Sequence, residues 1–256
     1  IRDDLVTGVQ TCALPIFKGF SRLDAKLHGW IKMSDYMDYS AGAAWMDGEI
    51  IPISEAKISV LDWGLTRSDI TYDVVHVWNG AFFRIDDYLE RFMTSMGKLR
   101  LNVGLDKEEI RSALITLIST SGLKSAYVSM VASRGIPIIP GTRDPRACKN
   151  HFYAWAVPFV WVIPQEVAKR GAHISIAQET RRISIKSVDP TVKNYHWGDM
   201  TTALFQALDD GFDTTVLLDQ NDLITEGPGF NIFAIIKIGR AHVSTPVTRS
   251  SRMPSS

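Results

Sequence analysis

The sequence predicts an α+β fold, because strand signals outnumber helix signals and the two do not alternate regularly. Apolar runs flank two dipeptides, Asp47-Gly48 and Asn79-Gly80, which tolerate the positive φ angles of tight hairpin turns. Helical signals are confined to three segments, 86–97, 106–119 and 199–210. Together these observations predict mixed sheets with a few helices and no internal repeat.

In the first half, two hairpins, two helices, one strand and one loop are expected over residues 44–53, 71–84, 86–97, 106–119, 126–132 and 136–146. Asp86 is expected to cap the first helix at its N-terminus, and Gly97 to end it. The second helix has an acidic first turn, which suits the partial positive charge of a helix N-terminus. The loop 136–146 contains three prolines and two arginines, so it is expected to be irregular and to border a functional site.

In the second half, an apolar run, a polar linker, a strand, a helix and two further strands are expected over residues 152–162, 164–171, 173–178, 199–210, 214–218 and 231–236. The linker is predicted to separate an N-terminal α+β domain, 17–163, from a C-terminal domain, 172–237. Residues 1–16 and 238–256 resemble translated sequencing adapter, so both are interpreted as non-native flanks. The second flank is rich in Ser, Pro and Arg and is expected to be disordered.

Composition argues against several classes of function. The 256 residues carry 28 basic and 28 acidic side chains, a net charge of +0 without a basic block, so neither nucleic acid nor a membrane is expected as a partner. No apolar run approaches the roughly 18 residues that span a bilayer. Two distant cysteines, Cys12 and Cys148, predict no disulfide framework and favour the cytoplasm. No histidine pair has metal-ligand spacing, so no metal is expected.

Three residues are the best candidates for chemistry. Lys193 lies in a polar and aromatic bend, and a lysine that forms an imine with a carbonyl group must spend time neutral. Glu226 precedes Gly227-Pro228-Gly229, where the backbone turns sharply or approaches another group closely. Arg91 has the planar guanidinium that suits a phosphate. The simpler interpretations stay open: a solvated lysine, a polar strand edge and a surface ion pair.

Seven short stretches follow one another in a recognisable order over nearly all of 44–236. They are Ser68-Asp-Ile-Thr-Tyr-Asp-Val-Val75, Val77-Trp-Asn-Gly80, Phe82-Phe-Arg-Ile-Asp-Asp87, Lys98-Leu-Arg-Leu101, Asp189-Pro-Thr-Val-Lys-Asn194, Trp197-Gly-Asp199 and Thr225-Glu-Gly-Pro-Gly-Phe-Asn231. In this order the chain resembles the class IV, or fold-type IV, pyridoxal-phosphate aminotransferases. That group contains branched-chain and D-amino acid aminotransferases, (R)-selective amine transaminases and aminodeoxychorismate lyase, and the likeness is greatest to the (R)-amine branch. The resemblance implies a two-domain architecture like that of D-amino acid aminotransferase.

The resemblance also implies a cofactor, pyridoxal 5'-phosphate, and a role for each matching residue. Lys193 would hold the cofactor as an internal aldimine and move a proton between the substrate Cα and the cofactor. Glu226 would keep the pyridine nitrogen protonated, which preserves the ring as an electron sink, and Arg91 would bind the phosphate. The remaining implied residues are Phe230 and Asn231 along the ring, Tyr72, Tyr127 and Trp197 in the substrate pocket, and Arg143 as the partner of a keto-acid carboxylate.

The implied reaction is ping-pong transfer of an amino group between an amine or amino acid and a 2-oxo acid, in a homodimer. On motif likeness alone, D-amino acids or (R)-amines rank slightly above branched-chain L-amino acids as donors. A lyase that releases pyruvate from aminodeoxychorismate stays open as an alternative on the same scaffold. So does a non-catalytic fragment that only folds or associates.

The C-terminal part departs from the family pattern. After the Glu226 strand the family continues with a Gly-Ile-Thr-Arg-type helix start and a Thr-Thr-Ala-Gly loop, and neither occurs in this sequence. A helix N-terminus is a strong anion site, and missing strands leave others without partners. The departure therefore predicts an incomplete second domain and a chain that is poorly soluble and weakly active or inactive.

Overall fold

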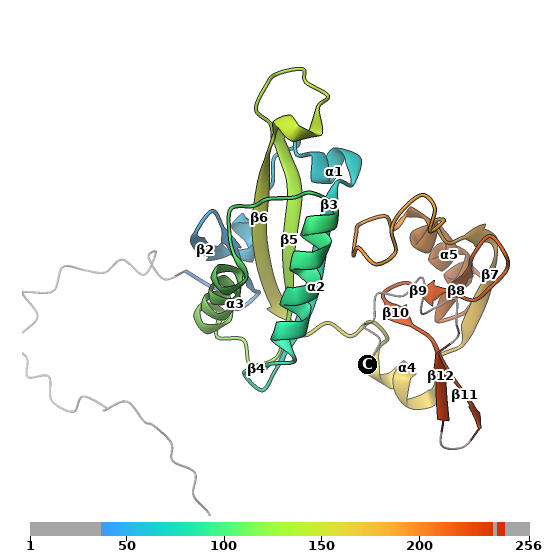
Figure 1. Ribbon diagram of the computed structural model, residues 1–256. Helices are drawn as coiled ribbons and strands as arrows, with labels where there is room; N and C mark the ends of the chain where they lie inside the picture. The colour runs from blue at the N-terminus through green and yellow to red at the C-terminus, as the bar shows by residue number, and fades with distance from the viewer. Residues whose placement is uncertain (1–36, 238–239, 244–256) are drawn as a thin grey trace, which may run out of the picture. The chain divides into compact units, whose positions relative to one another are not determined.

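A computed structural model describes residues 37–237 and 240–243 (Figure 1). Its largest layer is a six-stranded sheet in the order β2-β1-β6-β5-β3-β4, in which every pair of neighbours is antiparallel. The strands are β1 (Ala43–Met46), β2 (Glu49–Pro52), β3 (Ile70–Trp78), β4 (Ala81–Phe82), β5 (Ala126–Pro137) and β6 (Cys148–Pro158). A 3-10 turn, η2 (Ile53–Glu55), and a short helix, α1 (Trp63–Arg67), connect β2 to β3.

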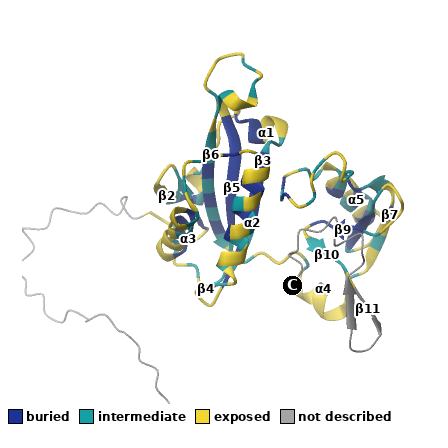
Figure 2. Ribbon diagram, viewed as in Figure 1, coloured by how far each residue is buried: buried dark blue, intermediate teal, exposed yellow. Residues whose placement is uncertain are grey.

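Two helices, α2 (Ile85–Lys98) and α3 (Lys107–Ser121), cover one face of this sheet. Side chains alternate along a strand, so one set of residues from β3, β5 and β6 packs against the helices while the other set faces away. Leu89 and Phe92 of α2 and Leu114 of α3 are fully buried against Val75 and Val77 of β3. Figure 2 shows the strands buried beneath helices whose outer sides remain exposed.

Both predicted hairpins are confirmed. Asp47 and Gly48 have φ angles of 52° and 93°, and Asn79 and Gly80 have 49° and 81°, as the turns between β1 and β2 and between β3 and β4 require. The predicted ends of the first helix are wrong. Arg84, in the left-handed conformation, is the residue that precedes α2, so Asp86 lies in the first turn; Gly97 lies within α2.

The central strands are longer than the apolar pattern indicates. The expected strand 126–132 continues as β5 to Pro137, and β6 begins at Cys148, so the irregular loop is shorter than expected and contains a 3-10 turn, η3 (Pro145–Ala147). A bulge between Ser133 and Ile136 makes this extension possible. Gly135 in the bulge has a φ of +74°, and a Cβ there would lie 1.8 Å from the Lys149 carbonyl oxygen.

The second half contains a smaller layer. β7 (Ile174–Arg181) pairs in parallel with β8 (Thr214–Leu218), and α5 (Gly198–Asp209) packs on them through a cluster that includes Met200 and Leu217. Parallel and antiparallel pairs therefore lie in separate sheets rather than in one mixed sheet. Two hairpins follow, β9 (Glu226–Gly227) with β10 (Phe230–Asn231) and β11 (Phe233–Lys237) with β12 (Arg240–Val243).

Two segments differ from the expected linker and tail. The predicted polar linker contains a short helix, α4 (Gln165–Arg170), which has no buried residue. Residues 240–243, expected to belong to a disordered tail, form β12. The expected flank 1–16 and the rest of the tail lie outside the described residues, and the positions of the domain boundaries stay predictions.

Candidate functional site

Lys193 directly follows a turn that begins at Asp189. The Asp189 carboxylate accepts hydrogen bonds from the Thr191 amide at 2.9 Å and from its hydroxyl at 2.6 Å. The Asp189 carbonyl oxygen accepts a third from the Val192 amide at 3.1 Å. Lys98, the last residue of α2, donates to the same carboxylate at 3.2 Å. Asp-Pro is a good turn start, because an aspartate side chain readily accepts hydrogen bonds from nearby backbone amides. Here the hydrogen bond from Lys98 also links the turn before Lys193 to α2.

The backbone of Lys193 is hydrogen-bonded to β3. Its carbonyl oxygen accepts hydrogen bonds from the Thr71 hydroxyl at 2.7 Å and from the Tyr72 amide at 3.2 Å. Its Nζ lies 4.7 Å from the centroid of the Tyr72 ring, a cation–π contact, and that ring lies 4.4 Å from the ring of Tyr195. Lys193 is therefore half-buried against aromatic rings, unlike a fully solvated surface lysine.

The sheet face opposite the helices carries aromatic and hydroxyl groups. The strand register places Tyr72 and His76 of β3 on the same face as Tyr127 of β5 and as Tyr153 and Trp155 of β6, and we call this set the aromatic face. Tyr127 stacks on Trp155 with 5.4 Å between the ring centroids. Burial raises the pKa of Tyr127 and of Tyr153 to about 12. Both hydroxyls are therefore neutral near pH 7 and can donate hydrogen bonds.

His76 is a titratable side chain on the aromatic face. Its ring centroid lies 6.4 Å from that of Tyr127 and 5.2 Å from that of Phe159. Burial lowers the pKa of the His76 imidazole, because desolvation disfavours the charged form. As the pH falls, His76 is therefore protonated in the unfolded chain at a higher pH than in the folded chain. We expect the contribution to stability to be complete above about pH 6.5 and to be lost as the pH falls to the lower folded-state pKa.

This expectation is checked by measuring the free energy of unfolding in denaturant at a series of pH values. His76→Gln should flatten the fall in stability below about pH 6.5. His173→Gln is the matched control, because His173 is exposed. An acid slope that His76→Gln leaves unchanged contradicts the expectation.

Glu226 is buried in a network of three charged side chains. Its Oε1 accepts a hydrogen bond from Arg182 Nε at 3.0 Å, and Arg182 Nη1 donates to Asp199 Oδ2 at 2.7 Å. The exposed fractions of the Glu226, Arg182 and Asp199 side chains are 9%, 7% and 14%. Charged groups buried to this extent require partners. Glu226 is therefore not the solvated strand edge that composition alone allows.

The turn after Glu226 brings aromatic rings against its glycines. A Cβ on Gly227 would lie 2.2 Å from the Phe230 ring, so that ring rests directly on the glycine backbone. Gly229 has a φ of +84°, and a Cβ there would lie 3.7 Å from Cη2 of Trp197. Asn231, opposite Glu226 in the hairpin, has a buried Oδ1 without a hydrogen-bond donor among the described residues. Such an acceptor is one that a bound group can satisfy.

Arg91 of α2 holds Asp73 of β3 in a two-pronged ion pair. Its Nε donates to Asp73 Oδ2 and its Nη2 to Asp73 Oδ1, both at 2.7 Å. Burial alone would lower the pKa of Arg91, but the hydrogen bonds and charge of Asp73 outweigh burial and raise it. Asp73 is 1% exposed and Arg91 22%, so this pair is not the surface pair that the sequence left open. Phosphate binding by Arg91 stays a prediction, and a phosphate would share the guanidinium with Asp73.

The structure gathers the predicted residues into groups. Contacts join Lys193 to Tyr72, and Glu226, Phe230, Asn231 and Trp197 meet around the β9–β10 turn. Arg91 lies with Asp73, Tyr127 lies on the aromatic face, and Arg143 is exposed in the loop between β5 and η3.

The sequence motifs assign no role to Arg182 or Asp199. The strand expected over residues 173–178 ends before Arg182, whereas β7 continues to Arg181, so side-chain alternation does not single out Arg182 from the sequence. The role of Arg182 is visible only in its contacts with Glu226 and Asp199.

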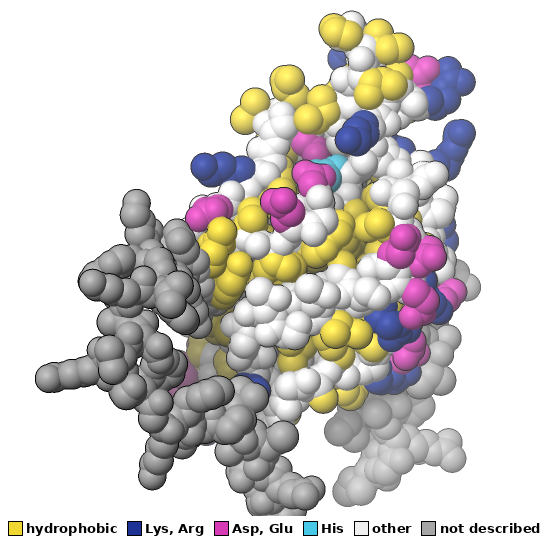
Figure 3. All heavy atoms as spheres, turned by 90° about the vertical axis from the view of Figure 1, so that its left-hand side faces the viewer, with side chains coloured by type: hydrophobic (Ala, Val, Ile, Leu, Met, Phe, Trp, Pro, Cys, Tyr) yellow, Lys and Arg dark blue, Asp and Glu magenta, His cyan; other side chains and the backbone are white. Residues whose placement is uncertain are grey.

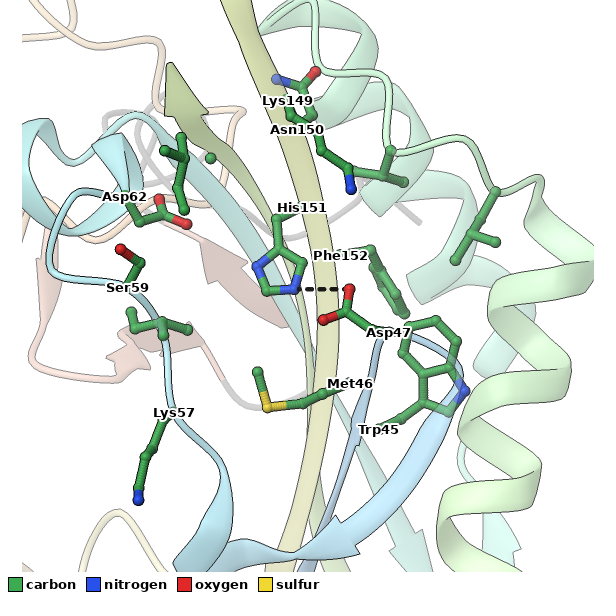
Figure 4. Close-up of a pocket in the computed structure, with 15 residues that line it drawn as sticks. Trp45, Met46, Asp47, Lys57, Ser59, Asp62, Lys149, Asn150, His151 and Phe152 are labelled. Atoms are coloured by element: carbon green, nitrogen blue, oxygen red, sulfur yellow. Dashed lines mark ion pairs between the residues drawn. The ribbon is translucent and has the colours of Figure 1, made fainter. Parts of the chain in front are cut away.

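Two cavities of similar size differ in their relation to these residues. One of about 410 Å³ lies beside β1 and β6 and is lined by Asp47, Lys57 and His151 among others (Figure 4). There the His151 ring points toward Asp47, with 3.6 Å between Nε2 and Oδ1, and no predicted site residue contributes to its lining. Another, of about 390 Å³, is lined by residues that include Val192 and Asn194, the two neighbours of Lys193.

Within the described part of the chain, no group of three or more His, Cys, Asp or Glu side chains could hold a metal ion. No helix in that same part has the length and apolar character needed to cross a bilayer. On the face shown in Figure 3, acidic and basic side chains are interspersed among apolar ones. This distribution accords with the net charge of +0.

Comparison with known proteins identifies relatives of this chain. The family model described as amino-transferase class IV matches residues 71–254, most of the chain. That range includes residues interpreted above as a non-native tail, and the origin of the tail stays a prediction. The protein of Methanocaldococcus jannaschii named "Putative branched-chain-amino-acid aminotransferase" is 29% identical over 76% of this chain and 65% of its own length. A D-alanine aminotransferase of Listeria monocytogenes is 26% identical over 54% of this chain and 41% of its own.

Solved structures agree with this result at the level of the fold. The branched-chain aminotransferase of Thermoproteus uzoniensis with norvaline has a TM-score of 0.67 and 25% identity, over 78% of this chain and 66% of that one. The branched-chain amino acid aminotransferase of Thermobaculum terrenum in its PLP-form has a TM-score of 0.66 and 20% identity, over 82% and 69%. The fold is thus that of the fold-type IV aminotransferases. The chain spans about two-thirds of the length of these proteins.

Proposed function

Because the chain belongs to the class IV aminotransferase family, we propose that the whole protein transfers an amino group between an amine or amino acid and a 2-oxo acid, with pyridoxal 5'-phosphate as cofactor. The observation that carries this proposal is the presence, in one chain of this family, of a part-buried Lys193 against the Tyr72 ring and a buried Glu226 paired with Arg182. A lysine and a carboxylate are the two groups that pyridoxal phosphate needs at its carbonyl and at its ring nitrogen.

The residues present fit this cofactor. Glu226 provides a buried acceptor for a ring N–H, and Asn231 provides a second buried acceptor beside it that lacks a donor among the described residues. The Phe230 ring and Trp197 offer apolar surfaces at the same turn. At the phosphate end, Arg91 carries a permanent charge on a planar guanidinium, the group that suits phosphate oxygens, and it is held in place by its ion pair with Asp73.

Pyridoxal phosphate, when bound, supplies a carbonyl carbon for covalent attachment and an electron-withdrawing ring that weakens bonds at the substrate Cα. Lys193 would hold the cofactor through Nζ and, once released from it, would take up the proton that leaves the substrate Cα. Glu226 would accept a hydrogen bond from the ring nitrogen and so would keep the proton there. Tyr72 and Tyr127 would line the substrate side, and Tyr127, whose pKa burial raises to about 12, would donate a hydrogen bond there near pH 7.

The amino donor is proposed from the likeness to the relatives, and experiment must identify it. Branched-chain and D-alanine aminotransferases both occur among the relatives, so donors of both configurations and (R)-amines belong in the test. Arg143 is proposed as the partner of the acceptor's carboxylate. We further propose a homodimer in the cytoplasm, on the family resemblance and on the presence of only two distant cysteines.

The test begins with the purified chain and pyridoxal 5'-phosphate. Borohydride reduction followed by peptide mass analysis should place a covalent adduct on Lys193. Amino transfer is then measured with L- and D-amino acids and (R)-amines as donors and a 2-oxo acid as acceptor. An adduct on a lysine other than Lys193 overturns the proposal. Pyruvate released without an acceptor and without an amino product favours the lyase instead.

A further inference from the structure

We infer that Arg182 is a positioning residue that holds the two ends of the cofactor site at a fixed spacing, an inference that rests on the proposed function above. Lys193 and Glu226 belong to different segments, so something must fix one relative to the other. Arg182 is 6% exposed and contacts both segments. It reaches Glu226 on one side and, on the other, the stretch that follows Lys193 through His196 and Asp199.

The backbone of Arg182 is held on both sides, which gives its side chain a fixed base. Its amide donates to the Leu218 carbonyl oxygen at 2.8 Å, at the end of β8. Its own carbonyl oxygen accepts a hydrogen bond from Gln220 Nε2 at 2.6 Å. The arginine is therefore anchored to the smaller sheet before its side chain contacts the site.

The side chain then divides its donors between the two segments. Nε donates to Glu226 Oε1 at 3.0 Å, while Nη1 donates to Asp199 Oδ2 at 2.7 Å and to the His196 carbonyl oxygen at 3.4 Å. A guanidinium is planar and rigid, so the angle between its donors is constant. Glu226 cannot shift relative to His196 and Asp199 without breaking one of these hydrogen bonds.

Asp199 is a firm second anchor for this arrangement. Its Oδ2 also accepts a hydrogen bond from the Ile183 amide at 2.7 Å, and its Oδ1 accepts one from the Met200 amide at 2.8 Å. Asp199 lies in the first turn of α5, where a negative charge suits the helix dipole. The carboxylate therefore has little freedom of its own, and Arg182 transmits its position to Glu226.

The neighbouring arginine offers a matched comparison within the same segment. Arg181 pairs with Asp222 at 2.7 Å, and its side chain is 33% exposed. It has the same side chain and also an aspartate partner, but none of its hydrogen bonds reaches Glu226, Asp199 or the loop after Lys193. Substitution of Arg181 therefore measures the effect of losing an arginine ion pair while the hydrogen bonds of Arg182 to Glu226 and Asp199 remain.

The experiment compares the unsubstituted chain with Arg182→Met, Arg182→Lys, Asp199→Asn and Arg181→Met. The readouts are the dissociation constant of pyridoxal 5'-phosphate by equilibrium dialysis, and the pH midpoint of the bound cofactor's absorbance. We expect Arg182→Met to weaken binding by about 10- to 100-fold, as loss of outer partners does in metal sites. The midpoint should move upward by about one pH unit, because loss of a positive charge favours protonated forms. Arg182→Lys should restore the midpoint but only part of the affinity, since it keeps the charge and loses the planar fork.

Arg181→Met should match the unsubstituted chain in both readouts. If Arg182→Met does not fold, Arg182→Lys and Asp199→Asn decide with the same readouts, and affinity unchanged in both overturns the inference. Arg182 variants that unfold more easily yet bind with an unchanged constant and midpoint show a merely structural arginine, which also overturns it. A cofactor adduct on another lysine removes the proposed function and this inference together; an unsubstituted chain that binds normally, matched by its Arg182 variants, removes this inference alone.

Discussion

Lys193→Ala should abolish the covalent attachment of pyridoxal 5'-phosphate to the chain. The Lys193 Nζ lies against the Tyr72 ring, and the Lys193 backbone is hydrogen-bonded to Thr71 and Tyr72, so β3 fixes the position of this lysine. The borohydride-trapped adduct should fall from one per chain to none. Any amino transfer that the chain supports should fall by about 10⁴-fold or more, because both covalent attachment and proton transfer are lost.

Lys186→Ala is the control for this prediction, because Lys186 is an exposed lysine a few residues upstream in the loop that leads to Lys193. It should retain the adduct and the activity. The stability of both variants is compared by denaturant titration, since the backbone hydrogen bonds of residue 193 do not depend on its side chain. A Lys193→Ala chain that still forms one adduct shows that another lysine carries the cofactor.

Glu226→Gln should produce the second largest loss. The substitution keeps the shape of the side chain and an oxygen that accepts from Arg182, but it removes the charge that we propose for the ring nitrogen of the cofactor. Loss of one preorganised electrostatic group in an active site lowers rates by about 10² to 10³-fold. The network also loses one charged hydrogen bond. We therefore expect the free energy of unfolding to fall by about 1.5–3 kcal/mol, with Asp199 still paired to Arg182.

The two effects are separated by measuring them independently. Amino transfer and the absorbance of the bound cofactor report on the ring nitrogen, whereas denaturant titration reports on the buried network. Glu179→Gln on β7 is the control, because Glu179 is exposed and hydrogen-bonded to Gln206 at 3.0 Å. Full activity in Glu226→Gln, at unchanged cofactor affinity, would refute the proposed role of Glu226.

Elements governed by local chemistry could be predicted from the sequence. The hairpin turns at Asp47-Gly48 and Asn79-Gly80 depend only on the residues within them, so both appear where the dipeptides lie. The start of α2 could not be predicted in the same way. Arg84 adopts a left-handed conformation immediately after β4, which is uncommon for arginine. The length of β5 depends on its pairing with β6 across a bulge, and that pairing is not local.

The site residues also differ in whether their roles depend on neighbours in the sequence or on contacts distant along the chain. Lys193 and Glu226 belong to compact sequence motifs, so both could be proposed as site residues from the order of those motifs along the chain. Arg182 could not, because its meaning lies in contacts with Glu226 and Asp199, which are 44 and 17 residues away along the chain. The pairing of Arg91 with Asp73 was hidden for the same reason, since it links a helix to a strand that precedes it.

The hydrogen bonds between Lys193 and β3 have a consequence for the order of folding. They join residues 122 positions apart in the chain, and contacts of such long range form late because they close a large loop. During synthesis, β3 and its neighbours emerge and can pair well before residue 193 leaves the ribosome. The part of β3 that receives Lys193 is then an open strand edge, which is prone to pair with other chains. The segment that carries Lys193 then adds hydrogen bonds to that part of β3, so it also shields this stretch of the sheet from pairing with other chains.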